Sequence, residues 1–440
     1  MNKELDLIVF GATSFVGKII CRYLATEYIE PNFSWAIAAR SQEKLERLRS
    51  TLGSEAQHIP IIVAESFDKA ALAAMCDRAA VVLSTVGPYA LYGEALVEAC
   101  VTSGTDYCDL TGEPQWMKRM ISRYSEQAKL SGARIVHACG FDSLPSDLGV
   151  KFLQQHSQAG FGEPCSTVKM RVKAMKGGAS GGTIASGMNA FKEASRDPQV
   201  RAEMKDWYSL CPAAHGNSAK QRHVYMEYDE DFKSWVGPFI MASVNTRVVL
   251  RTNALLNEQY GRQFYYGEGS LTGAGDAGRK SAKRITLGTK LFGAVLMLPP
   301  LQWLALKFFL PKPGEGPSPD EQRAGFFDLR FWGRTDSGGE VRVKVTGDRD
   351  PGYGSTAKMI AQAAISLRLD VDKSSLEGGF WTPGSAFGEA LFQRLEASAG
   401  LTFEVDNMTA GEVGRAKLYA RSGSGGERFG VWQGTTTFRL

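Results

Sequence analysis

The sequence predicts an α/β protein in which a parallel, doubly wound sheet is joined to a second domain of α+β character. Over the first ~150 residues, continuous apolar runs alternate with segments of helical periodicity, which is typical of parallel strands with right-handed helical crossovers. Further along the chain, polar and apolar residues alternate instead. That pattern favours antiparallel strands with one face in water.

The first part of the chain contains the apolar runs. They predict strands at 5–10, 34–39, 59–63, 79–85, 105–110 and 133–138. Helical spacing predicts helices at 16–27, 41–52, 68–76 and 89–104, and one more between the last two strands. Asp68 is the expected N-cap of its helix, and Gly104 the expected end of another.

The second part is predicted from alternation and from two clear helical patterns. Strands are expected at 166–175, 239–252 and 340–348, and helices at 183–196 and 354–369. The proline-rich segment 310–321 is typical of an extended linker, and the glycine- and serine-rich segment 421–430 of a loop or of disorder.

Composition excludes several classes of protein. A net charge of +4 over 440 residues is too small to indicate nucleic-acid binding. Seven scattered cysteines without a C-x-x-C pattern favour free thiols in a reducing compartment, and five histidines without H-E-x-x-H give no support for a metal site. The N-terminus is too short and acidic for a signal peptide, so we expect a cytoplasmic protein.

The stretch LIVFGATSFVG (7–17) has the features of a dinucleotide-binding turn. Gly11 ends a strand, Gly17 lies in the first turn of a helix, and Ser14 stands where a middle glycine is expected. The backbone N–H groups of this turn would hold a pyrophosphate. The candidate cofactor-binding residues here are Gly11, Ala12, Thr13, Ser14, Phe15, Val16 and Gly17. A purely structural strand-to-helix turn is the alternative.

The second predicted strand ends in a basic residue. Arg40, followed by Ser41 and then Lys44, would place a planar cation where an acidic residue would bind the ribose of NAD. This favours the 2′-phosphate of NADP(H) over NAD(H). A solvated arginine at a strand end is the alternative.

Two further glycine-rich stretches behave differently. GAGDAG (273–278) matches G-x-G-x-x-G, but the polar stretch before it does not predict a buried strand, so we interpret it as a loop. KGGASGGT (176–183) joins a strand to a helix and could hold an anion or a substrate carbonyl oxygen. Its candidate substrate-binding residues are Ser180, Gly181, Gly182 and Thr183; a flexible connection is the alternative.

Five longer motifs resemble a known family. They are STVGPYALYGEALVEACVTSGTDYCDLTGE (84–113), HACGFDSLPSDLG (137–149), SGGTIASG (180–187), GDRDPGYGSTAKM (347–359) and GGFWTPGSAFGEALFQRL (378–395). The chain resembles the saccharopine dehydrogenase-like oxidoreductases, in particular the trans-acting enoyl reductase branch. The family pattern usually has glycine where Ser14 stands.

The resemblance implies a divided architecture. An NADP-binding Rossmann domain would occupy 1–150 and an α+β substrate domain 151–350, with an apolar insertion at 285–310. Residues 351–400 would pack back on the Rossmann domain, and 401–440 would form a C-terminal extension.

The resemblance also implies an activity, which is NADPH-dependent reduction of an enoyl double bond in a lipid or polyketide intermediate. An acyl carrier or a polyketide synthase is the partner this implies. One alternative is imine reduction, with Arg171, Arg247 and Arg251 binding substrate carboxylates. Another is a non-catalytic, membrane-associated protein that keeps NADP as a structural ligand.

Loops after the strands of a doubly wound sheet face the cofactor, so VGPY (86–89), LTGE (110–113) and CGFDS (139–143) should line the site. Val86 and Gly87 are expected beside the cofactor. Enoyl reduction needs a proton and a donor to the carbonyl. Tyr89 is the first candidate, with Asp142 and Ser143 as alternatives; an Asp–Ser turn is the simpler interpretation of that pair.

The segment 291–310 is apolar and follows a basic segment, 278–290. Twenty such residues could span a bilayer, but Pro299 and Pro300 would break a helix at mid-depth. We therefore expect peripheral contact of 285–310 with the inner face of the plasma membrane. A buried helical hairpin or a homodimer contact is the alternative.

Overall fold

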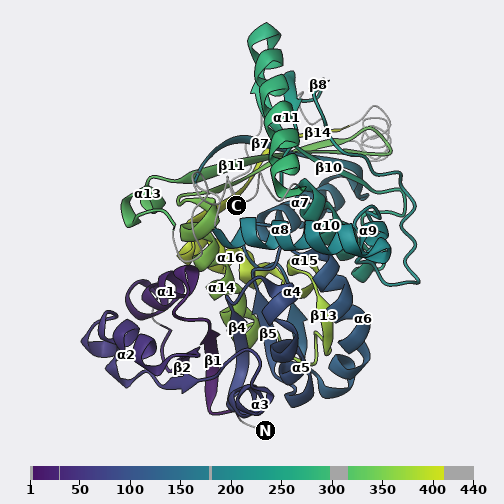
Figure 1. Cartoon of the computed structure of the whole chain (residues 1–440). Coiled ribbons are helices and arrows are strands. Elements are labelled where there is room, and N and C mark those ends of the chain that lie inside the picture. The colour runs from purple at the N-terminus through teal and green to yellow at the C-terminus, as the bar shows by residue number, and fades with distance from the viewer. Residues whose placement is uncertain (1–2, 29, 178–180, 298–315, 411–440) are drawn as a thin grey trace, which may run out of the picture.

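Two seven-stranded sheets organise the protein (Figure 1). The computed structural model describes residues 3–28, 30–177, 181–297 and 316–410. The first sheet is parallel throughout and the second is mixed. The predicted α/β class, with a doubly wound sheet and a second α+β part, is confirmed.

The first sheet has the strand order of a dinucleotide-binding domain with one additional edge strand. From one edge to the other its strands are β3 (Ile61–Val63), β2 (Trp35–Ala39), β1 (Leu5–Phe10), β4 (Ala79–Ser84), β5 (Asp106–Asp109), β6 (Arg134–Val136) and β13 (Gly379–Trp381). Since all neighbours are parallel, the carboxyl ends of the strands lie along one edge.

Strand β1 shows why this sheet is covered on both faces. Leu7 and Val9 belong to one core cluster, and Ile8 and Phe10 belong to the other, on the opposite face. Phe10 is 2% exposed and the other three are fully buried. A continuous apolar run therefore gives a central strand.

The helices that connect these strands largely follow the predicted pattern. They are α1 (Phe15–Arg22), η1 (Tyr23–Glu27), α2 (Gln42–Ser50), η2 (Ser54–His58), α3 (Lys69–Arg78), α4 (Tyr89–Tyr92), α5 (Glu94–Ser103) and α6 (Pro114–Ser131). Asp68 caps α3, and Gly104 ends α5 in a left-handed conformation. The single helix expected over 89–104 is interrupted at Gly93, where a Cβ would lie 2.8 Å from the Trp116 ring.

The second sheet is built from long strands. In spatial order they are β14 (Leu401–Thr409), β12 (Glu340–Gly347), β11 (Phe326–Thr335), β7 (Cys165–Lys176), β10 (Tyr265–Gly273), β9 (Ser234–Gly237) and β8 (Glu227–Asp229). β7 pairs antiparallel with β11 but parallel with β10, so the expectation of antiparallel pairing at 166–175 is half correct. The long helical excursion between β7 and β10 permits the parallel return.

The remaining helices lie around and between the sheets. They are α7 (Leu144–Phe161), α8 (Gly181–Arg196), α9 (Pro198–Glu203), α10 (Ala242–Leu255), α11 (Gly275–Met297), α13 (Pro319–Arg323), η3 (Pro351–Ser355), α14 (Thr356–Leu369), α15 (Pro383–Ala386) and α16 (Glu389–Ser398). α14 packs on β1, β4 and β5, and its Ala361, Ala364 and Ile365 are fully buried. The chain after η3 thus supplies a helix and β13 to the first sheet and β14 to the second.

Two predictions from the sequence are wrong. Residues 239–252 were expected as a strand but lie mainly in α10. This segment is rich in β-branched residues, yet tertiary burial determines its structure: Arg251, for example, donates to the carbonyl oxygens of Leu210 and Phe380. Within the expected linker 310–321, α13 begins at Pro319 with a capping box from Ser318.

The interpretation of GAGDAG as a loop is also wrong. It joins β10 directly to α11, and a Cβ on Gly278 would lie 2.0 Å from the Gly273 carbonyl oxygen. The missed strand, YYGEGSLTG, buries polar and glycine residues: Glu268 accepts from Tyr266 Oη at 2.6 Å, and a Cβ on Gly269 would lie 2.5 Å from Val236 Cγ1.

Several predicted segments lie partly or wholly outside the described residues. These are 298–310 of the apolar insertion, 310–315 of the linker, and 411–440 of the C-terminal extension, which includes the whole of 421–430. None of the helices in the described ranges combines the length and the apolarity that crossing a bilayer requires.

Candidate active site

The turn after β1 is shaped for close approach of a ligand to the backbone. Gly11 has φ +83°, and a Cβ there would lie 2.7 Å from Thr85 Oγ1 and from Val86 Cγ2. A Cβ on Gly17 would lie 2.2 Å from the Gly11 carbonyl oxygen. The turn therefore requires glycine at both positions, and it presents the N-terminus of α1 at the carboxyl edge of the sheet.

Ser14 takes the place of a glycine without blocking this turn. Its Oγ accepts from the backbone N–H of Gly17 at 2.9 Å and so caps α1. The same oxygen lies 2.9 Å from Thr85 Oγ1, and Thr85 donates to the Gly11 carbonyl oxygen at 3.0 Å. The hydroxyl therefore fastens the loop after β1 to the loop after β4.

The loop after β2 carries Arg40, and helix α2 after it carries Lys44, the two predicted phosphate-binding cations. Arg40 is exposed and makes no hydrogen bond or ion pair within the described ranges. The Ser41 hydroxyl accepts from the backbone N–H of Lys44 at 3.4 Å and caps α2, so this oxygen already has a hydrogen-bond partner in the helix. A glycine cradle, with a guanidinium one strand away that has no partner in the described part of the chain, fits NADP(H).

Tyr89 is placed differently from the sequence-based expectation. Its ring is 5% exposed and packs on Trp116. The hydroxyl donates to the Ser84 carbonyl oxygen at 2.9 Å and accepts from the Leu110 backbone N–H at 3.1 Å. Burial also raises the pKa of this phenol. Both contacts tie the loops after β4 and β5 together, so the geometry favours a structural role over proton donation.

Glu113, which the sequence analysis did not single out, organises the same two loops. Its carboxylate accepts from the backbone N–H groups of Tyr89 at 2.8 Å and Ala90 at 3.0 Å, and from Ser186 Oγ on α8 at 2.7 Å. The side chain is 1% exposed, and burial raises its pKa while these three donors lower it. Glu113 thus ties helix α8 to the loops after β4 and β5.

Among the candidate proton donors predicted from the sequence, Asp142 is the one whose side chain is not engaged by another described residue. It is half-buried in the loop after β6, and a Cβ on Gly112 would lie 3.2 Å from its Oδ2. No hydrogen bond or ion pair of its side chain occurs in the described part of the protein. Burial raises its pKa to about 6. The neighbouring Ser143 is fully buried and donates to Asn245 Oδ1 at 3.0 Å, so its hydroxyl is occupied.

A buried His–Asp pair lies at the ends of β5 and β6 and was also missed. His137 Nδ1 lies 2.7 Å from Asp109 Oδ2, while Asp109 Oδ1 accepts from the backbone N–H groups of Thr111 and Ala138. Both residues are at most 4% exposed. Because each directly follows or ends a parallel strand and the two strands are neighbours, their positions in the sequence could have indicated the contact.

The arginines required for imine chemistry are not available for substrate carboxylates. Arg171 forms a buried ion pair with Asp229, and Arg247 and Arg251 donate to backbone carbonyl oxygens. Of the other predicted substrate-binding residues, Ser180 lies outside the described part. For Gly181, Gly182 and Thr183 only their place at the start of α8 is described.

Comparisons with known proteins agree with this site. Residues 7–136 match the family described as the saccharopine dehydrogenase NADP binding domain. The yeast saccharopine dehydrogenase (L-Glu forming) from Saccharomyces cerevisiae has the same fold, with a TM-score of 0.52, 12% identity, and coverage of 92% of this chain and 100% of that chain.

Relatives of known sequence cover nearly the whole chain. Rv2449c of Mycobacterium tuberculosis (strain ATCC 25618 / H37Rv) is 39% identical over 421 residues, which are 93% of this chain and 99% of the relative. The trans-acting enoyl reductase of Mycobacterium leprae (strain TN) is 37% identical over 416 residues, which are 91% of this chain and 97% of the relative.

These similarities confirm NADP(H) as the cofactor and an oxidoreductase as the class of enzyme. With the glycine cradle and the free Arg40 they describe an NADPH-dependent reductase. The chain belongs to the trans-acting enoyl reductase family, within the saccharopine dehydrogenase-like oxidoreductases.

Proposed function

We propose that this reductase saturates an α,β-unsaturated thioester in a lipid or polyketide intermediate, held on an acyl carrier or a polyketide synthase. The name of the relatives supports the enoyl reaction, and the matched domain supports NADPH as the source of reducing equivalents. One structural observation carries the assignment. Asp142, a carboxyl without a side-chain partner among the described residues, lies at the carboxyl edge of the sheet, on the loop beside the expected nicotinamide position.

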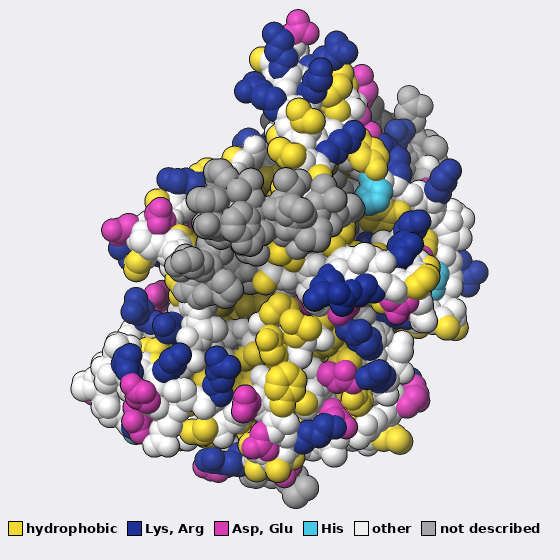
Figure 2. Space-filling model, in the orientation of Figure 1, with side chains coloured by type: hydrophobic (Ala, Val, Ile, Leu, Met, Phe, Trp, Pro, Cys, Tyr) yellow, Lys and Arg dark blue, Asp and Glu magenta, His cyan; other side chains and the backbone are white. Residues whose placement is uncertain are grey.

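Apolar side chains near this edge support an acyl substrate. Leu91 and Tyr92 on α4 are 48% and 38% exposed, and the Phe67 ring, 68% exposed, lies 5.8 Å from the Tyr92 ring. Ile240 is 54% exposed beside Met241, whose methyl group lies near Gly112. Figure 2 shows hydrophobic side chains gathered over α4. Such a group next to a polar site suits a long acyl chain.

The chemistry requires a hydride at the β-carbon and a proton at the α-carbon. NADPH supplies the hydride when it is bound. Asp142, which is protonated below a pKa of about 6, gives its proton to the α-carbon and becomes a carboxylate. The Asp142 carboxylate, which is only half-buried, then takes up a proton from water. Glu113 and Tyr89 hold the surrounding loops in place.

The test is the substitution Asp142→Asn. Because this side chain has no hydrogen-bond or ion-pair partner among the described residues, asparagine keeps its shape and disrupts none of the bonds described. We expect kcat with an enoyl thioester to fall ~100-fold or more, with the Kd for NADPH unchanged. The matched control is Asp77→Asn, an exposed carboxyl on α3, which should leave kcat unchanged.

The pH profile gives an independent readout. If the protonated carboxyl is the active form, wild-type kcat falls as pH rises through about 6, and the Asp142→Asn residual activity lacks that step. Wild-type kcat in the Asp142→Asn variant would remove Asp142 from the mechanism. NADPH binding without turnover of any enoyl thioester would remove the proposed reaction itself.

A further inference from the structure

Helix α11 (Gly275–Met297) stands out from the body of the protein (Figure 1). It follows β10 and turns back over the edge strands, with contacts to β9, β10 and α8. The site described above does not use it. Its exposed side therefore offers a surface that the proposed mechanism does not use.

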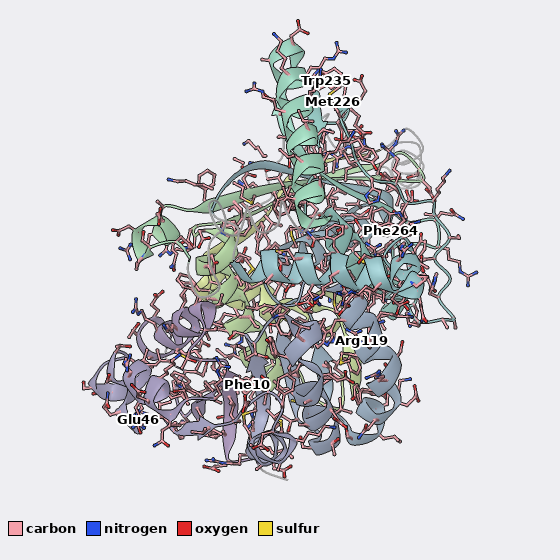
Figure 3. All side chains as sticks on the ribbon, in the orientation of Figure 1. Phe10, Glu46, Arg119, Met226, Trp235 and Phe264 are labelled. Carbon is pink, nitrogen blue, oxygen red and sulfur yellow. The ribbon has the colours of Figure 1, made fainter. Side chains whose placement is uncertain are left out.

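One side of α11 is firmly attached. Ala282 is fully buried, and a Cβ on Gly237 of β9 would lie 3.1 Å from Ile285 Cγ2. The Arg279 guanidinium lies 5.5 Å from the centroid of the Trp235 ring, which lies beside the helix (Figure 3). These contacts fix which side of the helix faces outward.

The exposed surface of this helix is strongly basic. The helix carries one acidic residue, Asp276, and five basic residues: Arg279, Lys280, Lys283, Arg284 and Lys290. All five are exposed, and none forms an ion pair within the described ranges. Figure 2 shows Lys and Arg side chains clustered around the protruding end.

Two large apolar side chains continue this basic surface. Leu287 is 66% exposed and Leu291 is 62% exposed. Lys280 and Arg284 precede them at spacings of four, three and four residues, so the four side chains form one stripe along the helix. The stripe runs from cationic to apolar, with no covering residues among those described.

We propose that this stripe docks the protein on the surface of a bilayer containing anionic phospholipid. Cations beside exposed leucines suit a headgroup layer, where the cations meet phosphate and the leucines enter the acyl boundary. A nucleic acid would satisfy the cations but leave the leucines in water. The inference depends on α11 alone and is independent of the proposed function.

The test is flotation of the full-length protein with vesicles. Wild type should float with vesicles of phosphatidylcholine and phosphatidylglycerol, and float much less with phosphatidylcholine alone or in high salt. Lys280→Gln with Arg284→Gln should weaken partitioning roughly 25-fold, about fivefold for each lost cation. Leu287→Ser with Leu291→Ser should weaken it at least as much.

Matched controls separate this surface from general charge and apolarity. Arg47→Gln with Lys129→Gln removes two exposed cations elsewhere, and Leu130→Ser removes an 89% exposed leucine on α6. Both controls should float like wild type, and all variants should bind NADPH normally, which shows that they are folded.

Three results would overturn the inference. Wild type could fail to float with the anionic vesicles. The Leu287→Ser, Leu291→Ser variant could float as well as wild type. Third, without vesicles, the Leu287→Ser, Leu291→Ser variant could sediment more slowly than wild type. That result would show that the stripe contacts a second copy of the chain.

Discussion

The Oγ of Ser14 lies 2.9 Å from the Oγ1 of Thr85 and also accepts the backbone N–H of Gly17 at 2.9 Å. One hydroxyl thereby caps α1 and joins the loops after β1 and β4. This relationship explains how a dinucleotide turn tolerates serine where glycine is expected: the side chain is bound by the protein itself. The nearby positions that must be glycine, Gly11 and Gly17, are glycine.

Ser14→Ala should therefore lower the free energy of unfolding by ~1 kcal/mol, since it removes a helix cap. Ser41→Ala is the matched control, because it removes the cap of α2, whose hydrogen bond is longer at 3.4 Å and exposed. Its cost should be smaller. Urea unfolding of both variants measures the difference, and equal losses would contradict the role assigned to the Ser14–Thr85 contact.

Arg40→Asp should weaken NADPH far more than NADH. Replacing an unpaired guanidinium with a carboxylate removes a charged hydrogen bond and adds repulsion to the 2′-phosphate, which corresponds to at least ~10-fold in Kd. Arg47→Asp, on the exposed side of α2, should change neither affinity. Calorimetric titration with both nucleotides is the measurement, and equal losses for NADPH and NADH would remove Arg40 from the phosphate site.

Glu268 should make stability depend on pH. Its side chain is 1% exposed, accepts from Tyr266 Oη at 2.6 Å and Asn245 Nδ2 at 3.0 Å, and burial raises its pKa to about 7. The folded state therefore holds the proton more tightly than the unfolded chain. Its contribution is fully present below the unfolded pKa and is lost as pH rises through about 7.

Relative to Glu268→Gln, wild type should lose up to ~1.4 kcal/mol of unfolding free energy per pH unit over that window. Urea unfolding across the window measures the difference between the two proteins. Glu55→Gln, at an exposed position, should follow wild type. A wild-type-to-variant difference that does not change with pH would contradict the raised pKa.

Much of the first sheet could be predicted because burial on both faces leaves a simple signal. The run at Leu5–Phe10, the capping Asp68 and the terminal Gly104 all act locally, so the sequence shows them directly. The segment that became α10 could not be predicted in this way. Its Arg247 and Arg251 are buried and donate to carbonyl oxygens of Met204, Asp206, Leu210 and Phe380, which are distant in the sequence.

In the candidate site, too, local features could be predicted from the sequence and contacts between distant segments could not. The glycine turn and Arg40 are local features and were expected at the carboxyl edge, where the structure has them. Tyr89 was expected to point at the substrate, but its hydroxyl bridges Ser84 and Leu110, which only the paired strands bring together. Glu113 was missed because its three donors come from α4 and α8.

The central claim is that the protein transfers hydride from NADPH to the β-carbon of an enoyl thioester. The direct measurement uses NADPH carrying deuterium in both positions at C4 of the nicotinamide, with mass spectrometry of the product. We predict one deuterium at the β-carbon and a solvent-derived hydrogen at the α-carbon. NADPH that is bound but not consumed, or a saturated product without deuterium, would contradict the claim.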